Sequence, residues 1–308
     1  MSHLLIQAST PLCLLQDAGR FGVRHLGVTQ GGAADWLSMA WANWLLGNSP
    51  DAAVIEVTLG GLSVVAKADC SLALAGADLA ATIDGQPLKP WRSFALKQGQ
   101  TLAFTRPLSG ARAYLAAPAG FVAPQVLGSC ATVAREQLGG PDGFGRGLVA
   151  GDELRYHGIV QALRDIPREH VPVFAANPRL DVILGAQIGD FTGQSTFDAF
   201  NLPWTLDSRA DRMGIRLLGP ELVYQGAPMI SEGIPLGAIQ VPPDGQPIVL
   251  LNDRQTIGGY PRLGALTPLA MARLAQSLPG EAVRMVPVMQ EMAHEQHLRY
   301  MKRFVCLK

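Results

Sequence analysis

The chain has 308 residues, 48% of them hydrophobic, and its acidic and basic side chains balance to a formal net charge of zero. This length predicts roughly two domains. The absence of a basic stripe argues against a protein that binds nucleic acid or an anionic membrane surface. The N-terminus lacks the pattern of a secretory signal, and no apolar run reaches the ~18 residues of a membrane span. We therefore expect a cytoplasmic protein.

The four cysteines, Cys13, Cys70, Cys130 and Cys306, are scattered without CxxC spacing. In a cytoplasmic protein such cysteines are expected to be reduced packing residues. Cys130, in the sequence GSCAT, is a candidate nucleophile. A structural role is favoured because no histidine lies near it in the sequence.

The first half is rich in short apolar segments separated by turns that contain glycine or proline. Such evenly spaced strands are typical of an antiparallel sandwich or barrel. Asp84-Gly85 predicts a tight hairpin turn. The expected strands are residues 4–6, 12–15, 54–58, 62–66, 71–75, 79–83, 93–97, 101–105 and 112–117.

Two places in the first half carry charged candidates for a site. Asp17 and Arg20 follow an expected strand, and an arginine there suits a carboxylate or a phosphate. A turn with a surface salt bridge is the simpler interpretation. The clearest helix is expected over 35–46, with Asp35 as its cap after two glycines. Its N-terminus is a candidate anion site, although the carboxylate of Asp35 would oppose an anion.

The middle of the chain contains a glycine-rich loop and a change of composition. The loop, 139–147, lacks the spacing of known phosphate loops, so a flexible loop or lid is the favoured interpretation. Residues 156–179 mix charge with prolines and predict a linker. We expect one domain over 1–155, a second over 180–290 and a helical tail over 291–308.

The second half has the same texture of short strands, with more helix. The tetrapeptide Asp-Gly-Gln-Pro occurs at 84–87 and again at 244–247, which is a weak hint of duplication. His294 and His297 lie three residues apart, but two imidazoles without a third ligand do not predict a metal site. The expected strands are 181–185, 215–219, 236–241, 248–251 and 283–286, and the expected helices are 194–200, 267–277 and 291–304.

The most unusual stretch is residues 231–260, the central run. Between Glu232 and Tyr260, ten polar side chains stand among residues that otherwise resemble a core. Buried polar groups are unfavourable unless they are paired, and strand ends and turns are where functional groups are usually placed. A functional site and a network that only locks the turns are equally good interpretations of these residues.

The central run, SEGIPLGAIQVPPDGQPIVLLNDRQTIGGY, resembles the signature of the biotin-dependent carboxyltransferase-like family, also called the allophanate hydrolase subunit 2 family. Further segments follow in the order of that family, so the resemblance covers nearly the whole chain. They are 16–28, 31–48, 56–61, 73–78, 114–121, 127–132 and 208–219.

The resemblance implies a mainly-β fold of two cyclophilin-like β-barrel subdomains with a few helices. It implies the C subunit of a multi-subunit, ATP-dependent 5-oxoprolinase, which opens 5-oxoproline to L-glutamate. The expected partners are a kinase-inhibitor-like B subunit and a LamB/YcsF-type A subunit. ATP is expected for the whole complex. Covalently attached biotin is not expected, because the chain has no biotinyl MKM motif.

Opening a stable lactam requires a cation or amide donors for the developing oxyanion, a clamp for anionic groups and a general base. We expect Arg254 and Arg20 to act as anion clamps. Asp253 or Asp17 is expected to serve as a base or as an orienting carboxylate. The expected substrate-binding residues are Gln240, Gln246, Gly258, Gly259, Tyr260 and Asp35.

Two other functions remain open. A biotin-dependent carboxyltransferase would act on a urea- or amide-like acceptor and would need a separate biotinylated carrier. A regulatory protein would sequester an inhibitor of a sensor kinase and would not need the polar residues of the central run for catalysis. Prolyl isomerase activity would rest on fold analogy alone, and we set it aside.

Overall fold

The computed structural model describes residues 2–157 and 162–306, which form two compact units. The first unit consists of Met1–Val23 and Gln30–Val173, and the second of Arg24–Thr29 and Phe174–Lys308. The later change of unit lies within the segment expected to be a linker, 156–179. The excursion of 24–29 into the second unit has no counterpart among the sequence-based expectations.

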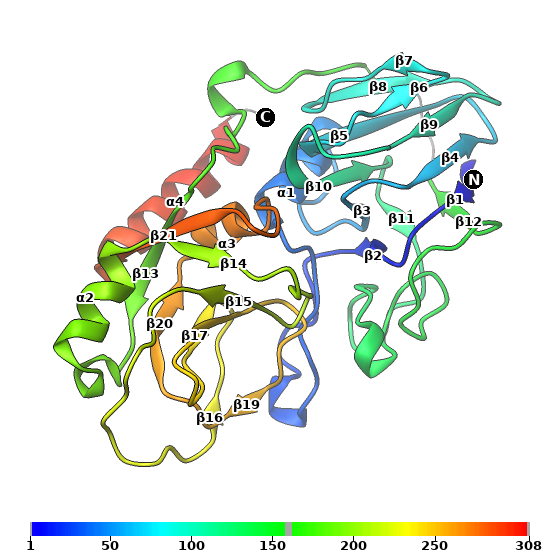
Figure 1. The fold of residues 1–308 in the computed structure, drawn as a ribbon. Helices are drawn as coiled ribbons and strands as arrows, with labels where there is room; N and C mark the ends of the chain where they lie inside the picture. The colour runs from blue at the N-terminus through cyan, green and yellow to red at the C-terminus, as the bar shows by residue number, and fades with distance from the viewer. Residues whose placement is uncertain (1, 158–161, 307–308) are drawn as a thin grey trace. The chain divides into compact units, whose positions relative to one another are not determined.

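The first unit contains two antiparallel sheets around one apolar core. One sheet has the strand order β11-β12-β1-β4-β9-β6-β7, and the other β2-β3-β10-β5-β8 (Figure 1). Their bounds are β1 Ser2–Ala8, β2 Cys13–Gln16, β3 Val54–Thr58, β4 Ser63–Ala66, β5 Cys70–Asp78, β6 Thr82–Ile83, β7 Gln86–Pro87, β8 Arg92–Leu96, β9 Thr101–Ala103, β10 Ser109–Ala116, β11 Phe121–Val122 and β12 Glu153–Tyr156.

Strand β5 shows how composition places the helix of this unit. Leu72 and Leu74 point into the core between the sheets. The alternate residues Ala73 and Ala75 are also fully buried, because helix α1 (Trp36–Leu45) packs on β5 and β10. Small side chains on one face of a strand let a helix approach closely. The strand is therefore buried on both faces, as its continuous apolar sequence suggests.

The hairpin expected at Asp84-Gly85 is confirmed. Both residues have positive φ, 47° and 81°, and the flanking residues Ile83 and Gln86 pair between β6 and β7. Two consecutive positive φ values define the type I′ turn that matches the twist of antiparallel strands.

The second unit is built on a closed barrel with the strand order β13-β20-β17-β18-β15-β14-β21. Strands β13 and β21 close it as a parallel pair. A separate two-stranded sheet joins β16 to β19. The strand bounds are β13 Arg179–Leu184, β14 Trp204–Leu206, β15 Gly214–Leu218, β16 Glu232–Gly233, β17 Ala238–Gln240, β18 Ile248–Leu250, β19 Ile257–Gly258, β20 Arg262–Leu266 and β21 Ala282–Val288.

Within the described part of the second unit, three α-helices accompany the barrel: α2 (Gly193–Asn201), α3 (Pro268–Leu274) and α4 (Gln290–Cys306) (Figure 1). Helix α3 begins as its sequence predicts, with the Thr267 hydroxyl accepting from the Ala270 amide at 3.2 Å. None of the described helices has the length and apolar character needed to cross a membrane.

The expected mainly-β class is confirmed, with a closed barrel in the second unit. In the first unit the strands are arranged as two sheets. Strand β20 was not among the expected strands, because its sequence, RLGAL, begins with a charge and contains a glycine. Gly264 is required there, since a Cβ at this position would lie 2.2 Å from the Ile183 carbonyl oxygen.

Candidate functional site

The central run forms strands β16 to β19 of the second unit and the turns between them. Strands β17 and β18 pair within the barrel and are joined by a turn in which the Gly245 amide donates to the Pro242 carbonyl at 2.9 Å. Gly245 has a φ of 70°, which favours glycine. The polar residues of the run lie at the end of β17, in this turn, after β18, and in or beside the β16–β19 sheet.

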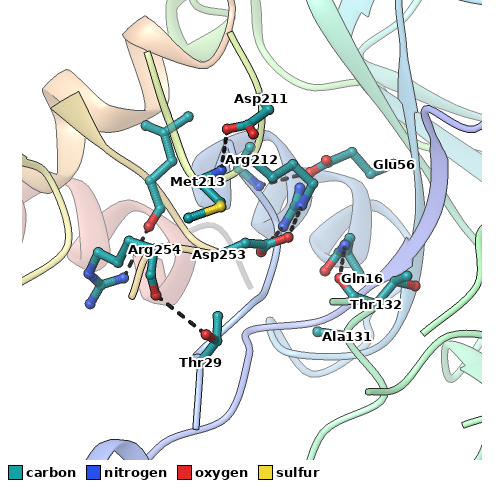
Figure 2. A network of polar contacts seen from close by, with 12 residues as sticks. Gln16, Thr29, Glu56, Ala131, Thr132, Asp211, Arg212, Met213, Asp253 and Arg254 are labelled. Atoms are coloured by element: carbon teal, nitrogen blue, oxygen red, sulfur yellow. Dashed lines mark hydrogen bonds and ion pairs between the residues drawn. The ribbon is translucent and has the colours of Figure 1, made fainter. Parts of the chain in front are cut away.

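Asp253 holds an arginine that lies outside the central run. Its Oδ2 and Oδ1 accept hydrogen bonds from Nε and Nη2 of Arg212 at 3.0 and 3.2 Å (Figure 2). The two residues also pair through the backbone, since the Asp253 amide donates to the Arg212 carbonyl at 2.9 Å. A buried carboxylate engaged on both oxygens is stabilised as an anion. These contacts suit an orienting carboxylate better than a general base.

Arg254 is the most deeply buried charge of the run, with only 2% of its surface exposed. Its Nε donates to the Ile234 carbonyl and its Nη1 to the Leu251 carbonyl, both at 3.2 Å. Its own carbonyl accepts from the Thr29 hydroxyl at 3.4 Å (Figure 2). The guanidinium is therefore fixed in direction by carbonyl dipoles of its own unit.

A second guanidinium reaches the same place from the 24–29 segment. Nη2 of Arg24 donates to the Ile234 carbonyl at 2.6 Å and to the Thr256 carbonyl at 3.1 Å. Burial, together with the positive charge of Arg24, lowers the pKa of Arg254 to about 9. Burial also lowers the pKa of Arg24. Because arginine keeps its proton in proteins, the result is a concentration of positive charge that an anion would stabilise.

Gln240 and Gly258 pack against each other. Gln240 is buried, and its Nε2 donates to the Tyr260 carbonyl at 3.5 Å. A Cβ on Gly258 would lie 2.6 Å from Cδ1 of Ile234 and 3.1 Å from Nε2 of Gln240. A side chain at position 258 would therefore have to displace the ends of these two side chains. A Cβ on Gly259 would meet only ordinary contacts.

Gln246 and Tyr260 differ in how they are held. The side chain of Gln246 accepts from the Gly219 amide at 2.9 Å and donates to the Gly219 carbonyl at 3.1 Å, which ties the turn to the end of β15. Tyr260 is 46% exposed. The contacts of Gln246 stabilise the turn, whereas the exposed side chain of Tyr260 is free to contact a ligand.

In the first unit, Asp17 is the centre of a buried hydrogen-bond network. Its carboxylate accepts from the Gly19 amide at 2.8 Å, the Ser129 hydroxyl at 2.6 Å and the Cys130 amide at 2.8 Å. The Cys130 thiol also lies 3.3 Å from Oδ2. One carboxylate joins two segments far apart in sequence, which suits a structural role for Asp17, while the catalytic role expected for it stays a prediction.

Arg20 is fastened to the same distant segment. It is 1% exposed, and it donates to the carbonyls of Val126 at 3.0 Å and Ala131 at 2.8 Å. A Cβ on Gly139 would lie 2.1 Å from the Ala131 carbonyl oxygen and 2.6 Å from Nη2 of Arg20, so the packing around the guanidinium is tight. The surface salt bridge considered from the sequence is wrong, because Arg20 is buried and its partners are carbonyls.

Asp35 caps helix α1, as expected. Its Oδ1 accepts from the amides of Leu37 and Ser38 at 3.1 and 3.0 Å. The amide of Asp35 itself donates to the hydroxyl of Tyr114, which donates to the buried carboxylate of Glu56 at 2.8 Å. The chain's own Asp35 carboxylate therefore accepts from the amides at this helix N-terminus, which opposes an anion there, and the substrate-binding role expected for Asp35 stays a prediction.

The glycine-rich loop at 139–147 is also engaged within the chain. Its Gly140 amide donates to the Cys130 carbonyl at 2.8 Å, and its Arg146 pairs with Asp142 and Asp152 at 2.8 and 2.7 Å. These bonds hold the loop against the first unit, and the expectation of a flexible loop or lid stays a prediction.

The cysteines of the described residues, Cys13, Cys70 and Cys130, are free and buried. Burial and the neighbouring Asp17 carboxylate raise the pKa of the Cys130 thiol, which disfavours the thiolate a nucleophile needs. The side chain of Cys306 lies outside the described part. Among residues 2–157 and 162–306, no three His, Cys, Asp or Glu side chains gather as metal ligands do.

The candidate residues thus fall into two sets. Asp17, Arg20 and Asp35 lie in the first unit, and the others lie in the second. Sequence reasoning missed Arg24, Arg212 and Glu56 as partners. Arg24 and Arg212 lie in segments that resemble the family, 16–28 and 208–219, and that was the available signal.

Comparison with known proteins places the chain in one family. The model of the carboxyltransferase domain, subdomain A and B, matches residues 26–287. The chain is 37% identical to the 5-oxoprolinase C subunit of Haemophilus influenzae, covering 91% of this chain and 89% of that protein. It is also 37% identical to the 5-oxoprolinase C subunit of Escherichia coli, covering 88% of this chain and 87% of that protein.

Larger proteins contain the same domain. The chain is 29% identical to urea amidolyase of Saccharomyces cerevisiae over 90% of this chain, but it spans only 16% of that protein. Among solved structures, TTHA0988 superposes with a TM-score of 0.82 at 33% identity, over 93% of this chain and 56% of that one. The chain belongs to the carboxyltransferase domain family, subdomains A and B.

Proposed function

We propose that this chain is the C subunit of an ATP-dependent 5-oxoprolinase, which opens 5-oxoproline to L-glutamate in the cytoplasm. The observation that carries the proposal is the 37% identity to two 5-oxoprolinase C subunits over roughly nine-tenths of each protein. A kinase-inhibitor-like B subunit and a LamB/YcsF-type A subunit would complete the enzyme.

The charge of the second unit suits this chemistry. The substrate carries a carboxylate, and activation of its lactam oxygen by ATP creates further anionic groups. Arg254 is buried, and its guanidinium is directed by backbone carbonyls of the central run. A cation fixed in a site of low dielectric stabilises a developing negative charge more strongly than one in water. We assign the anion-clamping role to Arg254. Asp253, its neighbour in the sequence, holds Arg212 in place.

The first unit supports the proposal differently. The contacts of Asp17 and Arg20 fasten distant segments. We therefore place the reacting groups in the central run and assign the first unit a supporting role. ATP is proposed as a reactant of the whole complex. The glycine-rich loop does not fit as a cradle for its phosphates, because the loop's Gly140, Phe144 and Gly145 amides are already engaged within the chain.

The test is reconstitution from separate proteins. The purified chain is mixed with the A and B subunits, and ATP hydrolysis that depends on 5-oxoproline is measured. We expect hydrolysis to stop when this chain is omitted, and to fall at least a hundredfold with Arg254→Gln. Arg284→Gln is the matched control, because Arg284 lies at an exposed position of β21. Full activity of Arg254→Gln would remove Arg254 from the site.

Carboxyl transfer is the second candidate function. It is favoured by the family description and by the similarity to urea amidolyase. In this alternative a separate biotinylated carrier delivers the carboxyl group to a urea- or amide-like acceptor. Saturable binding of biotin to the purified chain, without activity in the three-protein mixture, would support it. A stable complex with the kinase-inhibitor-like protein that forms equally well with Arg254→Gln, and that has no enzyme activity, would instead indicate that the chain regulates a kinase inhibitor.

A further inference from the structure

The 24–29 segment brings Arg24 into the second unit, although the residues on both sides of it belong to the first. Its guanidinium and that of Arg254 share one acceptor, the Ile234 carbonyl oxygen, at 2.6 and 3.2 Å. Two cations that converge on one neutral oxygen repel each other. The arrangement is therefore incomplete in electrostatic terms.

We propose that Arg24 and Arg254 form a binding site for a small oxyanion, either a carboxylate or a phosphate group. The position of the two guanidiniums alone carries the site. The choice of ligand rests on the proposed function, in which 5-oxoproline supplies a carboxylate and ATP supplies phosphates.

The hydrogen bonding of Arg24 supports an additional ligand. Its Nη2 has two carbonyl acceptors, but its Nη1 is buried and has no hydrogen-bond partner among the described residues. Buried donors in native structures are almost always satisfied by protein, water or a ligand. An oxyanion can accept from such a donor and offset the positive charge at the same time.

The acidic residue nearest in sequence to Ile234, Glu232, already forms an ion pair with an arginine of β20. Glu232 pairs with Arg262 at 2.6 Å. Arg24 is partly exposed, whereas Arg254 is 2% exposed, so an ion that arrives from solvent meets Arg24 first. This order makes Arg24 the residue that selects the ligand, and Arg254 the fixed charge behind it.

Binding is tested on the purified chain by calorimetric titration with three compounds at matched ionic strength. Inorganic phosphate probes a phosphate site and 5-oxoproline probes a carboxylate site. 2-Pyrrolidinone, the same lactam without the carboxylate, is the neutral control. We expect one or both anions to bind and the neutral lactam to bind at least tenfold more weakly, since hydrogen bonds to charged groups typically change affinity by tenfold or more.

Variants locate the site. Arg24→Gln should weaken anion binding at least tenfold, and Arg24→Lys should recover part of the loss because it keeps the charge. Arg284→Gln, on an exposed position of β21, should bind as the wild-type chain does. Melting temperatures show that each variant is folded. Binding by phosphate alone identifies a phosphate site, and binding by 5-oxoproline alone identifies a carboxylate site.

The proposal is overturned if neither anion binds the wild-type chain, or if folded Arg24→Gln and Arg24→Lys both bind as tightly as wild type. These results are separate from the fate of the proposed function. Enzyme activity that depends on the chain, together with anion binding that is indifferent to Arg24, would reject the anion site alone. Anion binding through Arg24 in a chain that adds no activity to the other two subunits would reject the function alone.

Discussion

The ion pair between Arg212 and Asp253 makes a quantitative prediction about the second unit. The Asp253 side chain is 8% exposed and that of Arg212 is 18% exposed. Removing one partner of a buried ion pair typically destabilises a protein by about 3–5 kcal/mol. Asp253→Asn keeps the shape and one neutral acceptor, and water reaches part of Arg212. We therefore expect a loss of about 2 kcal/mol in the free energy of unfolding.

Scanning calorimetry is the suitable assay, because a chain of two units need not unfold in one step. For a unit of this size each kcal/mol lowers the melting temperature by about 4 °C, so Asp253→Asn should lower one transition by about 8 °C. Arg212→Gln should lower the same transition. The double variant should be less destabilised than the sum of the two by about 1 kcal/mol or more, because the second change finds the pair already broken.

Lys97→Gln provides the control. Lys97 also pairs with an aspartate, Asp69, but their side chains are 67% and 51% exposed. Exposed pairs contribute little, so the melting temperature of Lys97→Gln should stay close to that of the wild type. If Asp253→Asn melts within 1 °C of wild type, or if the double variant is strictly additive, the burial argument for the pair is refuted.

Three further changes test the first unit. Burial and a neighbouring carboxylate hold the pKa of Tyr114 well above 10, so the folded chain keeps a proton that the unfolded chain releases. The free energy of unfolding should therefore fall as pH rises above about 10. Urea unfolding compared between pH 8 and 11 should show a weaker pH dependence in Tyr114→Phe. Burial and the Asp17 carboxylate raise the pKa of the Cys130 thiol, so mass spectrometry should find Cys130 unmodified by iodoacetamide at pH 8 in the folded chain; labelling at the rate of the unfolded chain would contradict this. Gly139→Ala should destabilise the protein by at least ~2 kcal/mol, because Gly139 has a positive φ and its added Cβ would lie 2.1 Å from a carbonyl oxygen. Gly128→Ala should cost about 1 kcal/mol, because Gly128 has a positive φ but its added Cβ would have no atom within 4 Å. Equal losses of the two variants in urea unfolding would show that the close approach is irrelevant.

Features with local causes were predictable from the sequence. The type I′ hairpin follows from an Asp-Gly pair between apolar strands, and the cap of α3 follows from a Thr-Pro start. Helix α1 is similarly predicted by Asp35 as its cap and by apolar residues at helical spacing. In each case the stabilising contacts lie within a few residues of one another.

Features that depend on distant contacts were not predictable. Arg20 is an arginine after a strand in the sequence, but carbonyls more than 100 residues away make it a buried fastener. Strand β20 requires a glycine only because Ile183 of β13 passes close to it. The approach of Arg24 to Arg254 depends on a six-residue excursion, and no periodicity in the sequence encodes it.

The central claim is that this chain is required for ring opening of 5-oxoproline. The most direct measurement follows isotopically labelled 5-oxoproline by NMR in a mixture of this chain, the LamB/YcsF-type subunit, the kinase-inhibitor-like subunit and ATP. The account predicts labelled glutamate in the complete mixture and none when this chain is left out. Equal formation of glutamate with and without the chain would contradict it.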